Sequence, residues 1–521
     1  MSSAYVSSEA PPQASRPTVV PPPPVPVAGE TYKQSETTRL LCAAAYLDRE
    51  FRDIVLKFCL EKRHHALGAC FGIDMPTVVR HCRNARRILS RRELWLLLPS
   101  IVLFFTVVGM LDMTASEFSI SAAARELMAG AVISSLTAFA ICVYFESRAR
   151  AIVIKNFMRG HFNPDAMLQN DDTPVEDLQA AETGNTVIYS GFTPFVGSGQ
   201  NMDAWSFALD LRKRACDANE QSTPDLTPAE IEKINIGALY DCVAREIGEL
   251  HLSRVTVQDR LYVNGRDIRD DTRFMRHPLD RPHYRVDEAV MRDAMLEQSE
   301  KQLRHYRCVR VVDWNGELVL SIFLRFTKLS HNLFVEASYY LLTPVAERFR
   351  AVDKMSPHFK FKRFFGMLLL SFIKTPFLTA FAPFALLSRM LTGVRQWSER
   401  REEEELILED PSFDYGAAFS FRQWASANEY RRYFQKLDKE MYLKVLEKNI
   451  LDAILTFLEE NDVDVSELKQ RQTMILNNGV MLSGSNFTAG NVAVGSGAKV
   501  DNVGQKIAQM ATKATTLPKP A

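Results

Sequence analysis

Two uncharged apolar runs stand out in the pattern of hydrophobic and polar positions along the chain. Residues 94–111 (LWLLLPSIVLFFTVVGML) and residues 127–145 (LMAGAVISSLTAFAICVYF) contain no charged side chain. At about 1.5 Å of rise per residue, each run as a helix approaches the roughly 30 Å thickness of a bilayer's hydrocarbon core. The pattern therefore predicts a transmembrane helical hairpin over residues 93–146, with two buried helices of a soluble core as the alternative.

Charges flanking the hairpin predict its orientation. Positive residues near membrane segments are retained on the cytoplasmic side. The connector over residues 112–126 carries three carboxylates and one arginine, so we expect the hairpin tip outside and both termini in the cytoplasm. The arginines that decide the orientation are Arg86, Arg87, Arg91 and Arg92 before the first run and Arg148 and Arg150 after the second.

A third apolar stretch, over residues 364–391, is interrupted by Lys374, Pro376 and Pro383. Split at Pro376, each arm as a helix reaches only about 22 Å, which is too short to cross. Basic residues flank both ends, so a single crossing would place one basic cluster outside. We expect a broken interfacial or re-entrant element over residues 356–395, and a third membrane span is the alternative.

The remaining sequence predicts an α+β protein. Residues 31–92 have helical spacing, a polar linker occupies 147–182, and residues 183–355 mix strand and helix signals. Alternating residues on both sides of Asn315-Gly316 predict a β-meander, and Asn264-Gly265 suggests a second hairpin. Thr227, Pro228 and Glu230 are typical of a helix start with a capping box.

The C-terminal third has two parts. Residues 396–470 form a helical region in which residues 428–461 keep apolar side chains at three- and four-residue spacing. Such spacing predicts a long amphipathic helix that packs against a partner. Residues 471–521 form a tail rich in glycine and asparagine and nearly free of charge between 477 and 504.

The tail could form stacked β-structure, because short apolar segments separated by asparagine and glycine suit in-register stacking. A flexible tail is the alternative, since low complexity is also typical of disorder. On the first interpretation, copies of the chain self-associate through Asn477, Asn478, Val480, Phe487, Val492 and Val494.

Composition narrows the functional classes. The 521 residues carry 63 basic and 63 acidic side chains, so the balance gives no indication of nucleic-acid binding. The eight cysteines are scattered without a CxxC pair, and the proline-rich start predicts that the chain has no signal peptide. Residues 1–30 are rich in proline, which predicts a disordered tether or a ligand for a proline-reading domain.

Candidate chemistry is sparse. Gly191, Gly197 and Gly199 follow a predicted strand and are weak candidates for binding an anionic cofactor, but they fit neither a phosphate loop nor GxGxxG. A structural turn is the alternative. The residue types of a metal site occur together at Cys59, His64, His65, Cys70, His81 and Cys82, with spacing that matches no zinc motif. We therefore expect no metal, no cofactor and no catalytic residue.

The chain resembles a group of bacterial multi-pass membrane proteins with a cytoplasmic α+β domain and a glycine- and asparagine-rich tail. The similar segments are IYSGFTPFVGSG at 188–199, DYGAAFSFRQ at 414–423, and the helical sequence from 434 that leads into ILNNGV and ends at AVGSGA. The resemblance implies a membrane protein with a cytoplasmic domain and a glycine- and asparagine-rich tail. We expect its location to be the bacterial inner membrane. It supplies no catalytic residue.

Together these features predict a membrane-anchored scaffold or signalling protein that faces the cytoplasm. Its partners would be the lipid bilayer and further copies of itself, joined through the C-terminal helix and the tail. A nucleotide-responsive sensor or enzyme housed in residues 183–355 is the alternative.

Overall fold

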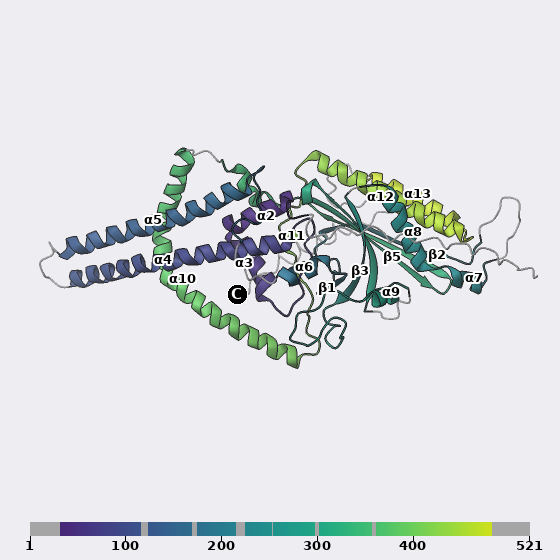
Figure 1. Ribbon diagram of the computed structural model, residues 1–521, viewed down its shortest axis with the longest axis horizontal. Coiled ribbons are helices and arrows are strands. Elements are labelled where there is room, and N and C mark those ends of the chain that lie inside the picture. The colour runs from purple at the N-terminus through teal and green to yellow at the C-terminus, as the bar shows by residue number, and fades with distance from the viewer. Residues whose placement is uncertain are drawn as a thin grey trace, which may run out of the picture. The chain divides into compact units, whose positions relative to one another are not determined.

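The computed structural model describes residues 32–115, 123–168, 175–214, 225–252, 254–296, 302–356 and 361–481, and these form a mixed α+β protein (Figure 1). The N-terminal helices are α2 (Glu36–Leu47), α3 (Arg49–Leu56), the π-helix η1 (Lys57–Glu61), α4 (Met75–Ala115), α5 (Ala123–Phe157) and α6 (Val175–Thr183). The strands are β1 (Thr186–Tyr189), β2 (Gln200–Asp210), β3 (Val255–Asn264), β4 (Arg304–Asp313), β5 (Leu318–Leu329) and β6 (Asn332–Leu342).

The other helices lie between and after the strands. They are α7 (Pro228–Lys233), α8 (Ile236–Glu249), α9 (Glu288–Leu296), the 3₁₀ turns η2 (Trp314–Gly316) and η3 (Glu347–Lys354), α10 (Phe361–Glu409), α11 (Phe421–Trp424), α12 (Tyr433–Glu460) and α13 (Ser466–Met481). The described residues divide into two compact units. Unit 1 draws on Met1–Trp205, Arg254–Arg325 and Glu336–Gln435, and unit 2 on Ser206–Ser253, Phe326–Val335 and Lys436–Ala521.

The two apolar runs form the predicted hairpin in unit 1. Helices α4 and α5 lie side by side (Figure 1), and small residues allow the close packing. A Cβ on Gly130 of α5 would lie 3.2 Å from Thr106 of α4, and the Ser134 hydroxyl donates to the Pro99 carbonyl at 2.5 Å. Both helices, with Phe365–Phe384 of α10, are long and apolar enough to cross a membrane.

Helix α10 crosses this hairpin. The ring of Phe372 lies 6.1 Å from that of Phe139 on α5, and Ala382, about three turns later, packs in one cluster with Leu96 of α4. The expectation of a broken element was wrong, because α10 is one helix of 49 residues that contains Pro376 and Pro383. Each proline removes a single backbone hydrogen bond and bends a helix without necessarily ending it.

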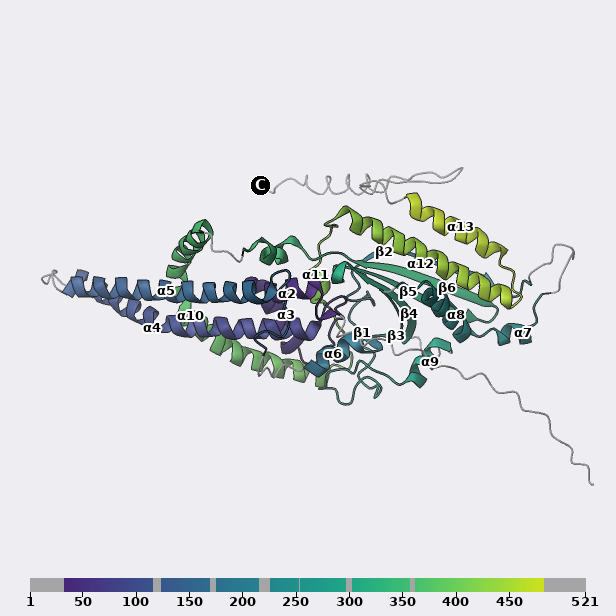
Figure 2. The same ribbon diagram turned by 45° about the horizontal axis from the view of Figure 1, so that its top comes forward.

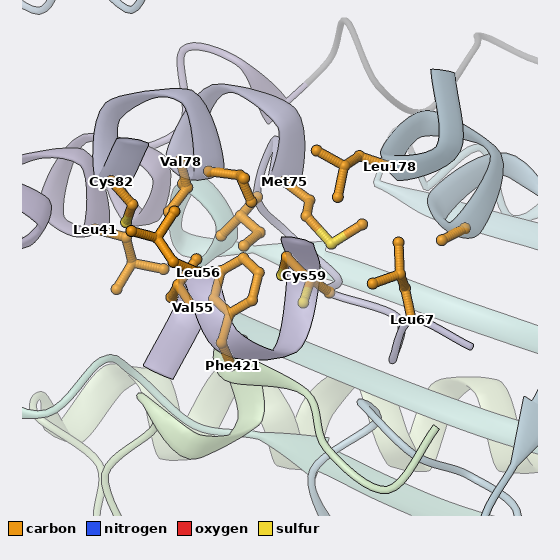
Figure 3. Packing of buried hydrophobic residues seen from close by; sticks show 14 of the residues in the cluster. Leu41, Val55, Leu56, Cys59, Leu67, Met75, Val78, Cys82, Leu178 and Phe421 are labelled. Carbon is orange, nitrogen blue, oxygen red and sulfur yellow. The ribbon is translucent and has the colours of Figure 1, made fainter. Parts of the chain in front are cut away.

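The core of unit 1 joins the predicted N-terminal helices to segments from much later in the chain. Apolar faces of α2, α3 and α4 meet residues of α6 and α11, as Figure 3 shows for Leu41, Val55, Val78, Leu178 and Phe421. Helix α5 continues beyond its apolar run into the same core, where Phe157 packs against Tyr46. The apolar hairpin and the folded core therefore share continuous helices.

A six-stranded sheet has the order β1-β3-β4-β5-β6-β2. Strand β1 is parallel to β3, with Ile188 opposite Val263, and β4 pairs antiparallel with β3 and β5. The predicted meander is confirmed as β4, β5 and β6, and the turn between β4 and β5 holds Asn315 at φ +53° and Gly316 at φ +83°.

The prediction of a second hairpin at Asn264-Gly265 was wrong. Strand β3 ends at Asn264, and no strand follows before β4 among the described residues. The Gly265 amide donates to the Tyr189 carbonyl at 2.9 Å, and the Gly265 carbonyl accepts from Tyr415 at 3.2 Å. This Asn-Gly pair therefore meets two other chain segments instead of turning the chain back.

Unit 2 is built largely from helices. The predicted capping box begins α7, because the Thr227 amide and hydroxyl donate to the Glu230 carboxylate while the Glu230 amide donates to the Thr227 hydroxyl. Helix α12 confirms the predicted long helix and lies beside α13 (Figure 2). Cys242 of α8 contacts the Ala453 carbonyl of α12, with the sulfur and oxygen 3.8 Å apart.

Candidate functional site

Helix α12 exposes an apolar face along its first half. At 100° per residue, the buried residues Leu446, Ile450, Ile454 and Leu458 lie on one side of the helix. The opposite side carries five large apolar side chains whose exposed fractions range from 36% to 70%. We call these residues the α12 stripe: Tyr433, Phe434, Leu437, Met441 and Val445.

The outer side of α12 changes character after the stripe. Its second half carries Lys448, Asp452, Thr456 and Glu459 on that side, as expected for a helix face in water. Large exposed apolar patches on folded proteins generally mark sites of interaction with another protein or a membrane. The stripe is therefore the strongest interaction feature on this helix.

Polar contacts anchor the first turn of α12 within unit 1. The buried Gln435 amide donates to one oxygen of Glu317 at 2.9 Å, and Arg350 donates to the other oxygen at 2.6 Å. Arg422, also fully buried, donates to the carbonyls of Gly316, Glu317 and Thr343, and burial lowers its pKa to about 10. Because Gln435 points inward, Tyr433 and Phe434 are held on the outer side.

The predicted self-association residues in the tail fall into two groups. Asn477, Asn478 and Val480 belong to α13, so the helix continues where a β-type segment was expected. Asp464 caps the start of α13 through the Ser466 amide, and weak helix formers such as asparagine and glycine are best tolerated at a helix end. Phe487, Val492 and Val494 lie outside the described residues.

The glycine loop after β1 packs tightly against the segment 414–423. The Gly197 amide donates to the Gln423 side chain at 2.9 Å, so it already has a partner. A Cβ would lie 2.0 Å from the Ala69 carbonyl at Gly197 and 2.0 Å from the Leu341 carbonyl at Gly199. Gly191 has open space around it and lies next to Phe192, which is 99% exposed. The loop geometry favours a structural turn.

The cysteine and histidine set is dispersed in the core of unit 1. Within the described residues, no group of three or more cysteine, histidine or carboxylate side chains could hold a metal ion. His81 contacts the Tyr46 hydroxyl and the Pro164 carbonyl, and His65 contacts Glu403 at 2.9 Å. His64 contacts the Leu279 carbonyl, Cys70 lies beside Ser420, and burial raises the pKa of the Cys59 and Cys70 thiols.

The arginines chosen as markers of orientation lie at one end of the hairpin. Arg86, Arg87, Arg91 and Arg92 precede the apolar part of α4, and Arg148 and Arg150 follow that of α5, where the antiparallel helices bring the two groups together. Arg86 pairs with Glu61 at 2.7 Å, and Arg150 pairs with Glu146 one turn away.

Sequence reasoning missed the α12 stripe as a surface, although the signal was present. Tyr433, Leu437, Met441 and Val445 recur every four residues, which predicts a shared face but not whether that face is covered. It also missed a cavity between α3, α4 and α10, described below, because its residues are far apart in the sequence.

The fold is that of an α+β protein in which the described residues include three helices long and apolar enough to cross a membrane. Residues 204–493, more than half of the chain, match the AbeC-like domain. The chain therefore belongs to the AbeC-like family. Comparison with curated proteins and with solved structures gave no match.

Proposed function

We propose that this AbeC-like protein is a membrane-anchored scaffold or signalling protein that self-associates on the cytoplasmic face of the bacterial inner membrane. The hairpin of α4 and α5 anchors the chain, and its arginine-rich end faces the cytoplasm. The single observation that supports this proposal most strongly is the α12 stripe, an uncovered apolar face within the family domain.

A second copy of the chain suits the stripe as its occupant. Its aromatic side chains and methionine are residue types enriched at protein interfaces. Over 13 residues the stripe extends about 18 Å, and two copies could place the same face against each other about a two-fold axis. Charges of both signs border it, at Asp438, Glu440 and Lys444, so charge of a single sign does not oppose the approach.

Anchoring strengthens a weak contact. Copies held in one bilayer with α12 on the same side meet at a high effective concentration, so a small interface suffices for association. Residues 482–521, the part of the glycine- and asparagine-rich tail that follows α13, then add further contacts between copies. In this mechanism the membrane concentrates the chains, α12 pairs them and the tail enlarges the assembly.

The test is the copy number of the full-length protein in detergent, measured by light scattering and by chemical crosslinking. The double variant L437E/M441E buries two charges in the proposed interface and should weaken association by about tenfold or more. The control T456E places one carboxylate on the outer side of α12 beyond the stripe and should leave the copy number unchanged.

Removal of residues 482–521 separates the two contributions. Pairs should persist and larger assemblies should disappear. An unchanged copy number in L437E/M441E would refute the role of the stripe, and an unchanged size distribution after tail removal would refute the role of the tail. Thermal-shift measurements of the full chain with nucleotides test the alternative of a nucleotide sensor, which a large specific shift would favour.

A further inference from the structure

A cavity of about 450 Å³ lies within unit 1 between α3 with η1, the middle of α4, and α10. Its volume falls in the range of small-molecule sites, about 300–1,000 Å³. One part of its lining is apolar and comes from helices long and apolar enough to cross a membrane, through Leu96 of α4 and Leu378 and Phe381 of α10. The other part is strongly charged, so the cavity is amphipathic.

Cations outnumber carboxylates in the charged part. Asp53, Glu61 and Glu93 are the carboxylates in the lining, and five basic side chains face them. Two pairs are formed at close range, Arg86 with Glu61 at 2.7 Å and Arg49 with Asp53 at 3.4 Å. The net charge of the lining is therefore positive. The five cations are Arg49, Arg52, Lys57, Arg86 and Arg92.

Two of these arginines retain hydrogen-bonding capacity. Within the described residues, the buried Nε atoms of Arg52 and Arg92 have no hydrogen-bond partner. The Arg52 side chain is only 3% exposed, its Nη1 donates to the Ala45 carbonyl at 3.1 Å, and its Nε lies 3.8 Å from Asp53. A buried guanidinium group without full pairing costs folding free energy, which an anion in the cavity would recover.

The position of the cavity along α4 indicates the source of such an anion. Arg92 lies four residues before Leu96, about 6 Å along the helix, at the point where the uncharged run begins. Lipid phosphates lie at this boundary between hydrocarbon and water. Phe381 is 61% exposed, so an acyl chain could lie against it while the phosphate reaches the arginines.

We propose that this cavity binds one anionic phospholipid, with its phosphate among Arg52, Lys57 and Arg92 and an acyl chain along Leu378 and Phe381. The excess of positive charge selects a headgroup with net negative charge over a zwitterionic one. Because the lipid would contact α3, α4 and α10 together, it would stabilise the crossing of α10 over the hairpin. This inference is independent of the self-association proposal.

The experiment measures lipid retained by the full-length protein after purification from vesicles of phosphatidylglycerol and phosphatidylcholine, using native mass spectrometry. The wild-type protein should retain phosphatidylglycerol preferentially. The variant K57Q/R92Q should retain about tenfold less, as expected for the loss of charge-assisted hydrogen bonds. The control R148Q removes an arginine at the same end of the hairpin but outside the cavity and should behave as wild type.

Two further measurements of lipid retention identify the ligand. They also keep the test decisive if the double variant fails to fold. F381A leaves every charge in place and should also reduce retention, because it removes the acyl contact. Inorganic phosphate should not displace the lipid, whereas full displacement would indicate a site for soluble anions and overturn the proposal. Equal retention of both lipids, or wild-type retention by both K57Q/R92Q and F381A, would overturn it as well.

Discussion

Gly197 and Gly191 lie in one loop, both with positive φ, but only Gly197 approaches another backbone closely. Its φ is +88°, and a Cβ would lie 2.0 Å from the Ala69 carbonyl, whereas Gly191 has φ +74° and open surroundings. An alanine at either position is strained by the left-handed backbone. Only at Gly197 is there a steric clash in addition.

We therefore expect G197A to destabilise the protein by at least about 2 kcal/mol and G191A by about 1 kcal/mol. Thermal unfolding of the full chain in detergent, followed by intrinsic fluorescence, measures the difference between the two midpoints. Equal midpoints for the two variants would show that close packing against Ala69 does not matter.

Individual residues mark the limit of what could be predicted. Thr227, Pro228 and Glu230 act locally, so their capping box followed from spacing alone. The burial of Arg350 and Arg422 could not be foreseen, because their partners at Glu317, Gly316 and Thr343 are far away in the sequence. The close approach at Gly197 depends in the same way on a distant segment.

At the scale of elements, strands β3 and β4 carry a charged pair directly across the ladder. Asp259 lies opposite Arg307 in the register, and its carboxylate accepts hydrogen bonds from His305 and Arg307 at 2.9 Å. Burial of Asp259 would raise its pKa, but these two hydrogen bonds outweigh the effect and hold the pKa well below its ordinary value. Cross-strand pairs of this kind stabilise a sheet.

The sign of the pH dependence follows from that direction. The folded pKa of Asp259 lies below the unfolded value of about 3.9, so its stabilisation is present at neutral pH and is lost as pH falls below about 5. D259N should reduce stability by about 1–3 kcal/mol at pH 7. Its unfolding midpoint should also fall less steeply between pH 5 and 3 than that of the wild type.

The control D287N removes a carboxylate from an exposed position before α9 and should follow the wild-type pH profile. Parallel profiles for D259N and the wild type would contradict the assignment.

The meander was predictable because its turn at Asn315-Gly316 is local. The parallel pairing of β1 with β3 was not, since about 70 residues separate the paired strands.

At the scale of the molecule, orientation in the membrane decides which interactions are open to each region. If α10 lies in or across the interface without spanning, then α12 lies on the same side as the arginine-rich end of the hairpin. If α10 spans, α12 lies on the opposite side. The prolines at 376 and 383, the basic flanks and the crossing over α4 and α5 favour the first arrangement.

Labelling of intact cells with a membrane-impermeant maleimide distinguishes the arrangements. We expect S119C, in the connector of the hairpin, to be labelled without permeabilisation. T456C, on the outer side of α12, should be labelled only after permeabilisation. Labelling of T456C in intact cells would show that α10 spans the membrane. Absence of labelling at S119C would show that the hairpin has the opposite orientation.

Helix α4 runs without interruption from Met75 in the core of unit 1 to Ala115 near the hairpin tip. Its Val78 and Cys82 are fully buried in that core, while Leu98 and Phe105 farther along are largely exposed. Pro99 removes one backbone hydrogen bond between these regions, but the helix stays continuous across it. A change in bilayer thickness that tilts the hairpin would therefore move Val78 and its neighbours as well. With the hairpin in a bilayer, α4 would thus carry a mechanical change in the membrane to the folded core.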